Sequence, residues 1–274
     1  MSYPLLDTPR LDRYFIRIGY SERQAADYDT LATLHRLHPQ AIAFESLDSW
    51  CDHTPSLDPD AVFAKLVTER RGGWCFEQNQ LFARVLLTVG FKVQLMAARV
   101  IIPERQLPRT HKVLLVTLDS TRWLVDVGYG GMTMTAPLQL DSREPQETPH
   151  EPWLVKPLDD EFIVSAQVNG DWTPQFSFSL TRQITADYDM ANYVVANHPD
   201  SRFRHDLIAA RPDALGRHAL LNKRLSYHRH GRPSQHRELA SPTEAMQALQ
   251  QVFGINVDGI DGLPQQINRL FAAG

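Results

Sequence analysis

The chain has 274 residues, of which 43% are hydrophobic and 22% are charged. These values are ordinary for a globular protein that buries a large core and divides into two or three lobes. Its formal net charge of −4 argues against nucleic-acid binding, which uses strongly basic surfaces. The short basic runs at 202–205 and 228–230 therefore predict solvated faces or contacts with single anions.

The N-terminal residues do not resemble a signal peptide, because Pro4, Asp7 and Pro9 interrupt any apolar run. No stretch of the sequence approaches the roughly 20 apolar residues that a membrane helix needs. The two cysteines are Cys51 and Cys75, too few for a disulfide framework. We therefore expect a cytoplasmic protein that binds neither a membrane nor a nucleic acid. A Cys51–Cys75 disulfide is the alternative to two free thiols.

Apolar residues recur at helical spacing in four segments of the first 90 residues. These segments are 11–18, 31–37, 58–70 and 75–90. Gly19 and Pro39 are expected to end the first two helices. Residues 1–90 are therefore expected to form a helical bundle.

At residue 91 the composition changes to β-branched and apolar residues, which are typical of strands. The predicted strands are 93–102, 112–118, 122–127, 154–155, 162–167, 171–172 and 176–180. Asn169-Gly170, between two such runs, predicts a hairpin. Residues 91–186 are expected to form an antiparallel sheet or open barrel, with 142–152 as a long exposed loop.

The pattern becomes mixed in residues 187–274. Helices are expected over 187–197 and over 243–253, where Pro242 is well placed to open the second helix. Residues 219–228 are expected to pair as strands. The predicted fold class is therefore α+β and multidomain, with a helical bundle, a central antiparallel β-barrel and a C-terminal α/β part.

The run RGGWCFEQN at 71–79 places Cys75 where a helix begins. Gly72 and Gly73 allow the backbone to turn tightly and to approach a ligand closely. The apolar spacing downstream puts Cys75 in the first turn of the helix. A thiol there lies at the positive end of the helix dipole, which favours the nucleophilic thiolate. Cys75 is therefore the candidate nucleophile.

A thiol nucleophile usually needs a base and a group that orients the base. Among the 11 histidines, His111 stands at the entrance of a predicted strand, and Asp126 lies in the apolar run WLVDVG. With a hairpin turn at Asp119-Ser120, Asp126 faces Val113. His111 is then a diagonal neighbour on the same face, about 7–8 Å away and within reach of a carboxylate. A carboxylate in an apolar strand needs such a partner, so we infer that Cys75, His111 and Asp126 act together.

Each of the three residues also has a structural interpretation. Cys75 would then be a small buried hydrophobic residue, His111 a surface or capping residue, and Asp126 an acid held by backbone amides. A zinc site is disfavoured, because the sequence has neither a Cys-x-x-Cys nor a His-x-x-x-His pair. No phosphate-binding glycine loop or dinucleotide fingerprint occurs either. We therefore expect no metal and no tightly bound cofactor.

Several motifs together resemble the signatures of the arylamine N-acetyltransferases. They are AFESL at 43–47, RGGWCFEQN at 71–79, Thr110-His111, DVGYGG at 126–131, NHPDSRF at 197–203 and FGI at 253–255. They cover nearly the whole chain in family-like order and spacing. The resemblance implies a helical bundle (1–90), a β-barrel domain (91–186) and a C-terminal α/β lid (187–274). A cysteine-protease-like Cys-His-Asp core would lie at the junction of the first two.

The resemblance also implies an activity. An acetyl group would pass from acetyl-CoA, the co-substrate, to the nitrogen of an arylamine, arylhydrazine or hydroxyarylamine. The family mechanism is ping-pong, with acetyl-Cys75 as the intermediate and His111 as the general base. Asp126 would maintain the orientation and charge of His111. O-acetylation of N-hydroxyarylamines belongs to the same expectation.

Further residues match family positions around the substrate. Those expected to line the acceptor pocket, or to contact substrate through backbone groups, are Phe44, Val100, Thr110, Gly128, Tyr129 and Phe203. Plain core packing is the alternative for Phe44 and Phe203, and Arg71 matches an arginine with a structural role. Two residues depart from the family pattern. Ser46 replaces an asparagine, and Tyr129 replaces a phenylalanine and adds a hydroxyl expected to favour acceptors with a polar substituent.

Other proteins share the Cys-His-Asp order. Cysteine proteases and transglutaminases make a hydrolase or an amide-forming enzyme the alternative activity. In a hydrolase, water would reach the acyl-cysteine quickly. A silent binding protein with the same fold would need no thiolate, and its Cys75 would alkylate no faster than Cys51.

Overall fold

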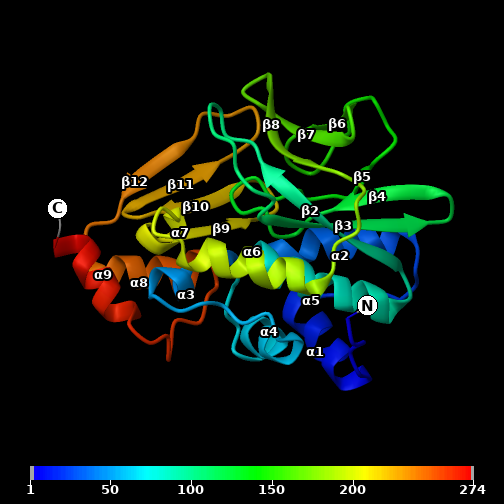
Figure 1. Cartoon of the computed structure of the whole chain (residues 1–274). Coiled ribbons are helices and arrows are strands. Elements are labelled where there is room, and N and C mark those ends of the chain that lie inside the picture. Colours follow the sequence, from blue (N-terminus) through cyan, green and yellow to red (C-terminus); the bar gives the residue numbers. More distant parts are fainter. Residues whose placement is uncertain (1–2, 273–274) are drawn as a thin grey trace.

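The computed structural model describes residues 3–272, and its helices follow most of the expected segments. The helices are α1 (Thr8–Ile18), α2 (Tyr28–Ala41), α3 (Leu47–Trp50), α4 (Pro59–Phe63), α5 (Cys75–Val89), α6 (Thr185–Asn197), α7 (Arg202–His205), α8 (Pro242–Gln247) and α9 (Leu263–Ala272), with π-helical segments η1 (Ala64–Thr68) and η2 (Ala248–Val252) continuing α4 and α8. In Figure 1, α1, α2, α4 and α5 lie together on the side where the chain begins.

Local signals set several helix ends. Gly19 ends α1 and Gly90 ends α5, both in the left-handed conformation with φ of 74° and 111°. Helix α2 is longer than expected, because it continues through Pro39 to Ala41. A proline in the last turn removes only one helical hydrogen bond, so it does not end the helix at once.

Within residues 3–272 the strands form two antiparallel sheets. The strands are β1 (Phe44–Glu45), β2 (Lys92–Val100), β3 (His111–Leu118), β4 (Thr121–Val125), β5 (Leu138–Gln139), β6 (Trp153–Leu158), β7 (Glu161–Val168), β8 (Asp171–Phe178), β9 (Ile208–Pro212), β10 (Arg217–Leu221), β11 (Arg224–His228) and β12 (Gln235–Glu238). One sheet has the order β5-β4-β3-β2-β8-β7-β6, and the other has the order β1-β9-β10-β11-β12.

The seven-stranded sheet forms a nearly closed barrel, because its two edge strands meet at Gln146. The backbone of Gln146 pairs with Trp153 of β6 in both directions, at 2.7 and 2.9 Å. Its side chain bonds the backbone of Gln139 of β5, also at 2.7 and 2.9 Å. One glutamine therefore joins the two edges and covers strand groups that would otherwise be unpaired.

The expected hairpins are confirmed. Strand β3 pairs with β4 in the register that a turn at Asp119-Ser120 produces, with Leu114 opposite Val125. Asn169 and Gly170 both have positive φ, 54° and 92°, and connect β7 to β8 in a tight turn. The register between β3 and β4 brings the positions of His111 and Asp126 to the same end of the hairpin.

The segment 142–152 is not the exposed loop that its composition predicts. Its first half is largely exposed, but His150 and Glu151 are buried, at 6% and 8% exposure. The Glu151 carboxylate accepts hydrogen bonds from the Arg217 guanidinium at 2.9 Å, and His150 Nε2 lies 3.1 Å from the Gly216 carbonyl oxygen. These contacts tie the barrel to the start of β10, so tertiary pairing overrides local composition.

The second sheet combines distant parts of the chain. Strand β1 pairs with β9, with Phe44 opposite Ala210. Leu47 and Trp50 of α3 pack in the same apolar core as α8 and α9. Residues 43–51 thus cross the division expected at residue 90, because their apolar side chains and strand edge find partners in the C-terminal part.

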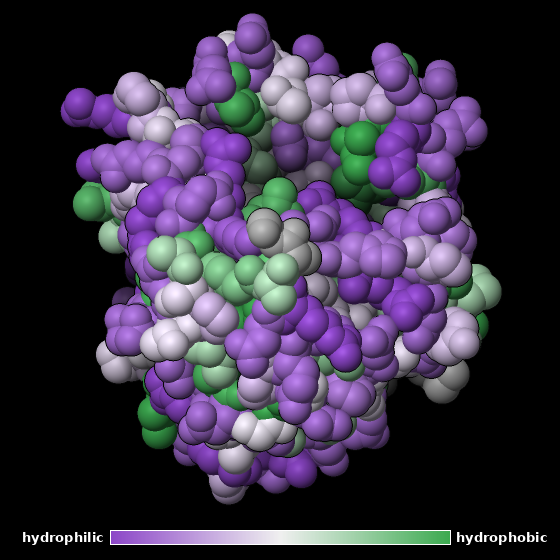
Figure 2. Space-filling model, turned by 90° about the vertical axis from the view of Figure 1, so that its left-hand side faces the viewer, coloured by the Kyte–Doolittle hydropathy of each residue, from purple (hydrophilic) through white to green (hydrophobic). Residues whose placement is uncertain are grey.

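Apolar side chains gather inside the molecule. Those of α1, α2, α4 and α5 pack with those of β3 and β4, so the helical bundle and the barrel share one core. Between residues 3 and 272, no helix is long and apolar enough to cross a membrane. Figure 2, which views the side that faces left in Figure 1, shows a mostly hydrophilic surface with hydrophobic residues in small groups.

The buried Glu151–Arg217 pair leads to a prediction about stability. In Glu151→Gln the buried Arg217 charge loses its carboxylate, so the free energy of unfolding should fall by about 3 kcal/mol. Urea unfolding followed by circular dichroism measures the change. The control is Asp141→Asn, which breaks an exposed ion pair with Arg122 and should cost about 1 kcal/mol or less. Equal losses in the two variants would contradict the structural role of the buried pair.

Candidate active site

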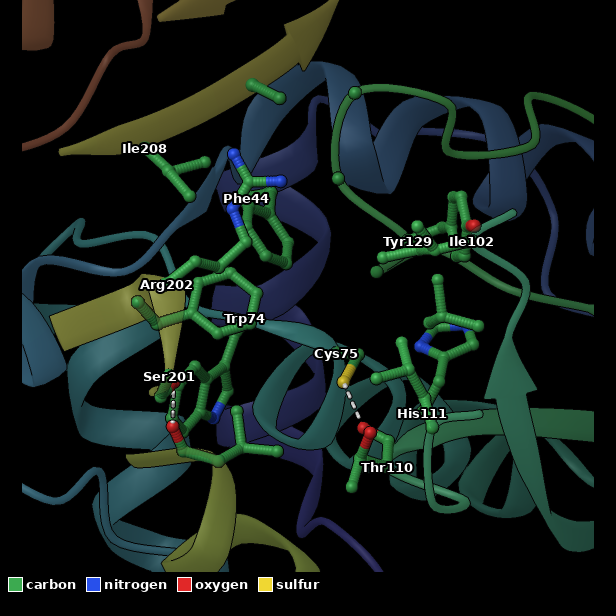
Figure 3. A pocket seen from close by; sticks show the side chains of 18 of the residues that line it. Phe44, Trp74, Cys75, Ile102, Thr110, His111, Tyr129, Ser201, Arg202 and Ile208 are labelled. Atoms are coloured by element: carbon green, nitrogen blue, oxygen red, sulfur yellow. Dashed lines mark hydrogen bonds between the residues drawn. The ribbon is translucent and has the colours of Figure 1, made fainter. Parts of the chain in front are cut away.

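Cys75 is the first residue of α5, as the sequence predicts. The N–H of Trp74, just before the helix, donates to Glu77 Oε2 at 3.1 Å, which satisfies a donor at the helix start. The Cys75 side chain is partly exposed, and its sulfur lies 3.8 Å from the Thr110 carbonyl oxygen (Figure 3). The thiol therefore combines access for a ligand with the positive end of a helix dipole.

The two glycines before Cys75 do not serve the expected approach to a ligand. A Cβ on Gly72 would lie 2.4 Å from the Ala43 carbonyl oxygen, and one on Gly73 would lie 2.7 Å from Glu77 Oε2. The close approach is therefore to the chain just before β1 and to the capping carboxylate. Gly73 also forms a parallel bridge with β1, which joins the start of α5 to the second sheet.

The structure brings His111 and Asp126 together. His111 Nε2 lies 2.6 Å from Asp126 Oδ2, and the two side chains are 3% and 0% exposed. Burial alone would lower the pKa of His111, but the charge and hydrogen bond of Asp126, together with the neighbouring Cys75, raise it to about 10. The imidazole is therefore protonated at neutral pH. Nδ1 is the ring nitrogen left to exchange a proton with Cys75.

Hydrogen bonds from several elements hold Asp126. Its Oδ1 accepts from Asn79 Nδ2 at 2.8 Å and from the Gly128 N–H at 2.9 Å. Its own N–H donates to His35 Nε2 at 3.2 Å. Burial acts to raise the pKa of Asp126, but His111, Asn79 and Gly128 hold it below its ordinary value. The Gly128 N–H is thus committed to Asp126 and is not free to bind a substrate.

A buried charge network lies beside the first turn of α5. Arg71 Nη2 lies 2.9 Å from Glu45 Oε1 and 2.7 Å from Asp48 Oδ1. Lys65 Nζ lies 2.6 Å from Asp48 Oδ2 and 2.7 Å from Glu77 Oε1. These contacts connect β1, α3, η1 and α5, and they are consistent with a structural role for Arg71.

Cys75 and His111 line a cavity of about 640 Å³. The six residues expected around the substrate also line it: Phe44, Val100, Thr110, Gly128, Tyr129 and Phe203. In Figure 3, Cys75 lies between Phe44 and Trp74 on one side and His111 and Tyr129 on the other. Strands β9 and β10 and the loop after β2 complete the walls. A cavity with aromatic walls and a few polar groups suits a small aromatic ligand.

The two residues that depart from the family pattern, Tyr129 and Ser46, each have a hydroxyl next to a backbone carbonyl oxygen. The Tyr129 hydroxyl donates to the Gln175 carbonyl oxygen at 2.7 Å, and its ring packs edge-on against His111, with centroids 5.1 Å apart. The hydroxyl hydrogen is therefore not available to an acceptor, which removes the simplest reason for the expected polar preference. Ser46 is buried and its hydroxyl lies 3.5 Å from the Asp206 carbonyl oxygen, outside the cavity lining.

The two cysteines lie in different surroundings. Both are free thiols, so the alternative Cys51–Cys75 disulfide is not formed. Cys51 is buried in the core that α3 shares with α8 and α9, and burial raises its pKa to about 12. Among residues 3–272, no group of three His, Cys, Asp or Glu side chains is placed to hold a metal ion.

Three residues near the site have no assigned role in the sequence prediction: Asn79, His35 and Lys112. Asn79 lies four residues after Cys75 on α5, a spacing that puts both side chains on one helix face and is a usable signal. His35 and Lys112 give weaker signals, since each is a polar residue in an otherwise apolar pattern. Their partners come from distant parts of the chain, which local spacing does not predict.

Comparison with known proteins supports the resemblance. A family model described as N-acetyltransferase matches residues 27–262. The chain is 38% identical over 255 residues to the arylamine N-acetyltransferase of Escherichia coli (strain K12), covering 92% of this chain and 90% of the relative. It is 36% identical over 257 residues to the arylamine N-acetyltransferase / N-hydroxyarylamine O-acetyltransferase of Salmonella typhimurium, covering 92% of this chain and 91% of the relative.

The fold agrees with the same family. A solved structure of the Mycobacterium marinum arylamine N-acetyltransferase in complex with CoA matches with a TM-score of 0.91 at 34% identity, covering 95% of this chain and 99% of that chain. The residues matched by the family model include every motif that carries the resemblance. The chain therefore belongs to the arylamine N-acetyltransferase family, a family of acyltransferases.

Proposed function

We propose that the protein transfers an acetyl group from acetyl-CoA to the nitrogen of an arylamine, arylhydrazine or hydroxyarylamine through acetyl-Cys75. The observation that carries this proposal is the position of Cys75 and the His111–Asp126 pair at the edge of a cavity with aromatic walls. The solved relative in complex with CoA supports the donor. The names of the relatives support the acceptors, and the Salmonella name supports O-acetylation of N-hydroxyarylamines.

In the first half-reaction, the Cys75 thiolate attacks the carbonyl carbon of the acetyl thioester. The bond between that carbon and the CoA sulfur breaks, and the leaving thiolate takes a proton from the His111 imidazolium. Asp126 accepts the Nε2–H hydrogen bond throughout and keeps the ring oriented. The products are CoA, acetyl-Cys75 and a neutral imidazole.

In the second half-reaction, the acceptor nitrogen attacks the carbonyl carbon of acetyl-Cys75. Neutral His111 takes the proton that the nitrogen loses, and the bond to the Cys75 sulfur breaks. These steps restore the thiolate and the imidazolium. Weakly basic aromatic amines should depend most on His111. Their neutral nitrogen is a poor nucleophile, so removal of its N–H proton by His111 helps its attack most.

The surroundings of Cys75 favour transfer over hydrolysis. The rings of Phe44, Trp74 and Tyr129 lie around the sulfur (Figure 3). They offer a flat arylamine aromatic contact and offer water few hydrogen-bond partners. A hydrolase with the same three reactive residues is the alternative, and the lifetime of the acetyl-enzyme distinguishes the two.

Residues 187–274 would act as a lid over the site, since β9 and β10 contribute Ala210 and Leu220 to the cavity wall. Arg71 would act structurally, by holding Glu45 and Asp48 beside the start of α5. Free thiols suit a reducing compartment, so the cytoplasm is the location we propose.

The acetyl-enzyme provides the test of the proposed function. Wild-type protein mixed with acetyl-CoA, without an acceptor, should gain one acetyl group in its intact mass, and an arylhydrazine should remove it. Cys75→Ala should gain none, and the matched control Cys51→Ala should behave as wild type. Release of CoA without an adduct would show hydrolysis instead. Neither an adduct nor CoA release would show a silent binding protein.

Asp126→Asn removes the charge that keeps His111 protonated, so kcat/KM for arylamine acetylation should fall by about 10²–10⁴-fold. Because the pKa of His111 is raised, the imidazolium is present below about pH 10 and lost above it. The rate of Cys75 acetylation, measured by rapid mixing, should therefore decline at high pH in wild type and at lower pH in the variant. Asp159→Asn, in an exposed turn, is the control. A decline at the same pH in wild type and Asp126→Asn would refute the assigned role.

Tyr129→Phe tests whether the Tyr129 hydroxyl holds the ring in place through Gln175 or contacts the acceptor. Because the hydroxyl bonds to Gln175, its removal should lower the free energy of unfolding by about 1 kcal/mol. The ratio of kcat/KM between acceptors with and without a polar ring substituent should stay nearly constant. Tyr193→Phe, on the exposed face of α6, should change neither quantity. A shift of the ratio by about tenfold, the worth of one good hydrogen bond, would show direct contact with the acceptor.

A further inference from the structure

Lys112 is a fully buried lysine, with 0% exposure, that directly follows His111 in β3. Its Nζ donates to the Tyr3 hydroxyl at 3.1 Å, the Phe76 carbonyl oxygen at 3.1 Å and the Gln80 Oε1 at 3.4 Å. All three acceptors are neutral. Among residues 3–272, no carboxylate lies within ion-pair distance of Nζ. A buried lysine without a paired carboxylate is costly and rare, so it calls for a functional explanation.

Aromatic rings surround the Lys112 ammonium. Nζ lies 4.3 Å from the centroid of the Tyr188 ring, 5.6 Å from that of Tyr3 and 5.8 Å from that of Phe76. Rings at these distances stabilise a cation through their negative faces. The pocket therefore accepts the charged form of the lysine, although it provides no opposite charge.

Of the negative charges that act on Lys112, that of the Cys75 thiolate has the largest effect. Phe76, which accepts a hydrogen bond from Nζ, is the residue after Cys75, and Cys75 packs in one apolar cluster with Phe76 and Tyr188. Burial lowers the pKa of Lys112 to about 7, and the charge of Cys75 opposes this fall more than those of Asp189 and Glu77 do. Lys112 therefore bonds to the residue that follows Cys75, and the ring nearest its ammonium belongs to the apolar cluster against which Cys75 packs.

The charges of the site then balance. A Cys75 thiolate, an Asp126 carboxylate and a His111 imidazolium together carry one negative charge, which the Lys112 ammonium cancels. We propose that Lys112 is a positioning residue that supplies this compensating charge and so favours the Cys75 thiolate in the free enzyme. The inference rests on the role proposed for Cys75. Acetylation of Cys75 removes the thiolate, so the ammonium then loses the charge that it balances.

The other groups that face Lys112 do not account for this coupling. Tyr3, Tyr188 and His111 come from the N-terminal segment, α6 and β3. Burial raises the pKa of both tyrosines far above its usual value, so both stay neutral at ordinary pH. The charges of Asp189 and Glu77 act on Lys112 less strongly than that of Cys75, and acetylation modifies neither residue. The change on acetylation is therefore carried by Cys75 and its proton partner His111.

The first test is the pH dependence of Cys75 alkylation by iodoacetamide, followed by mass spectrometry of the Cys75 peptide. Lys112→Met should move the midpoint of the rate–pH curve up by about one unit and slow alkylation by about tenfold at pH values below both midpoints. Lys112→Arg, which keeps the charge, should lie close to wild type. The control Lys156→Met, on the exposed part of β6, should match wild type. An unchanged midpoint in Lys112→Met, even with reduced stability, would make Lys112 merely structural and overturn the proposal.

A second test avoids any change at Lys112, in case Lys112→Met does not fold. Coupling between two protonation sites is reciprocal, so removal of the thiolate must make the ammonium lose its proton more easily. NMR of protein with carbon-13-labelled lysine should show Lys112 titrating about one unit lower in Cys75→Ser than in wild type. Equal midpoints would overturn the proposal. Neither test uses acetyl-CoA, so failure here is distinct from failure of the acetyltransferase assignment.

Discussion

The buried carboxylate of Asp126 constrains the rest of the structure. A carboxylate with 0% exposure is costly unless its oxygens are paired. Its partners are His111 of β3, Asn79 of α5 and Gly128 just after β4. The helical bundle and the barrel must therefore dock in one register for this charge to be satisfied. The same register sets Cys75 beside His111, so the requirement of stability and the geometry of the chemistry coincide.

The second sheet depends on the same junction. Strand β1 leaves the helical part, pairs with β9 and bridges to Gly73, two residues before Cys75. The sheet that closes the cavity is thus attached next to the candidate nucleophile. On its other side, the Glu151–Arg217 pair links the sheet to the barrel. Each part of the chain therefore supplies a wall of one site, and Phe44 of AFESL and Phe203 of NHPDSRF both line it. Phe253 and Ile255 of FGI lie instead in the core that α3 shares with α8 and α9.

Features with local causes could be predicted from the sequence. The start of α5 at Cys75 and the pairing of β3 with β4 follow from helical spacing and turn residues. Features with distant partners could not: β1 pairs with β9, Gln146 closes the barrel, and Glu151 is buried by Arg217. The same distinction between local and distant causes applies to the residues of the site. Its three reactive residues follow from motifs and strand pairing, whereas the surroundings of Lys112 come from segments that no local pattern connects.

The protonation state of His111 tests the central claim most directly. Nitrogen-15 NMR of protein with labelled histidine reports whether both ring nitrogens carry a proton. We predict an imidazolium in wild type at about pH 8, because Asp126 and Cys75 raise the pKa of His111 to about 10 against the effect of burial. We predict a neutral ring in Asp126→Asn. A neutral His111 in the wild-type protein at that pH would contradict the ion pair on which both the docking of the domains and the proposed chemistry depend.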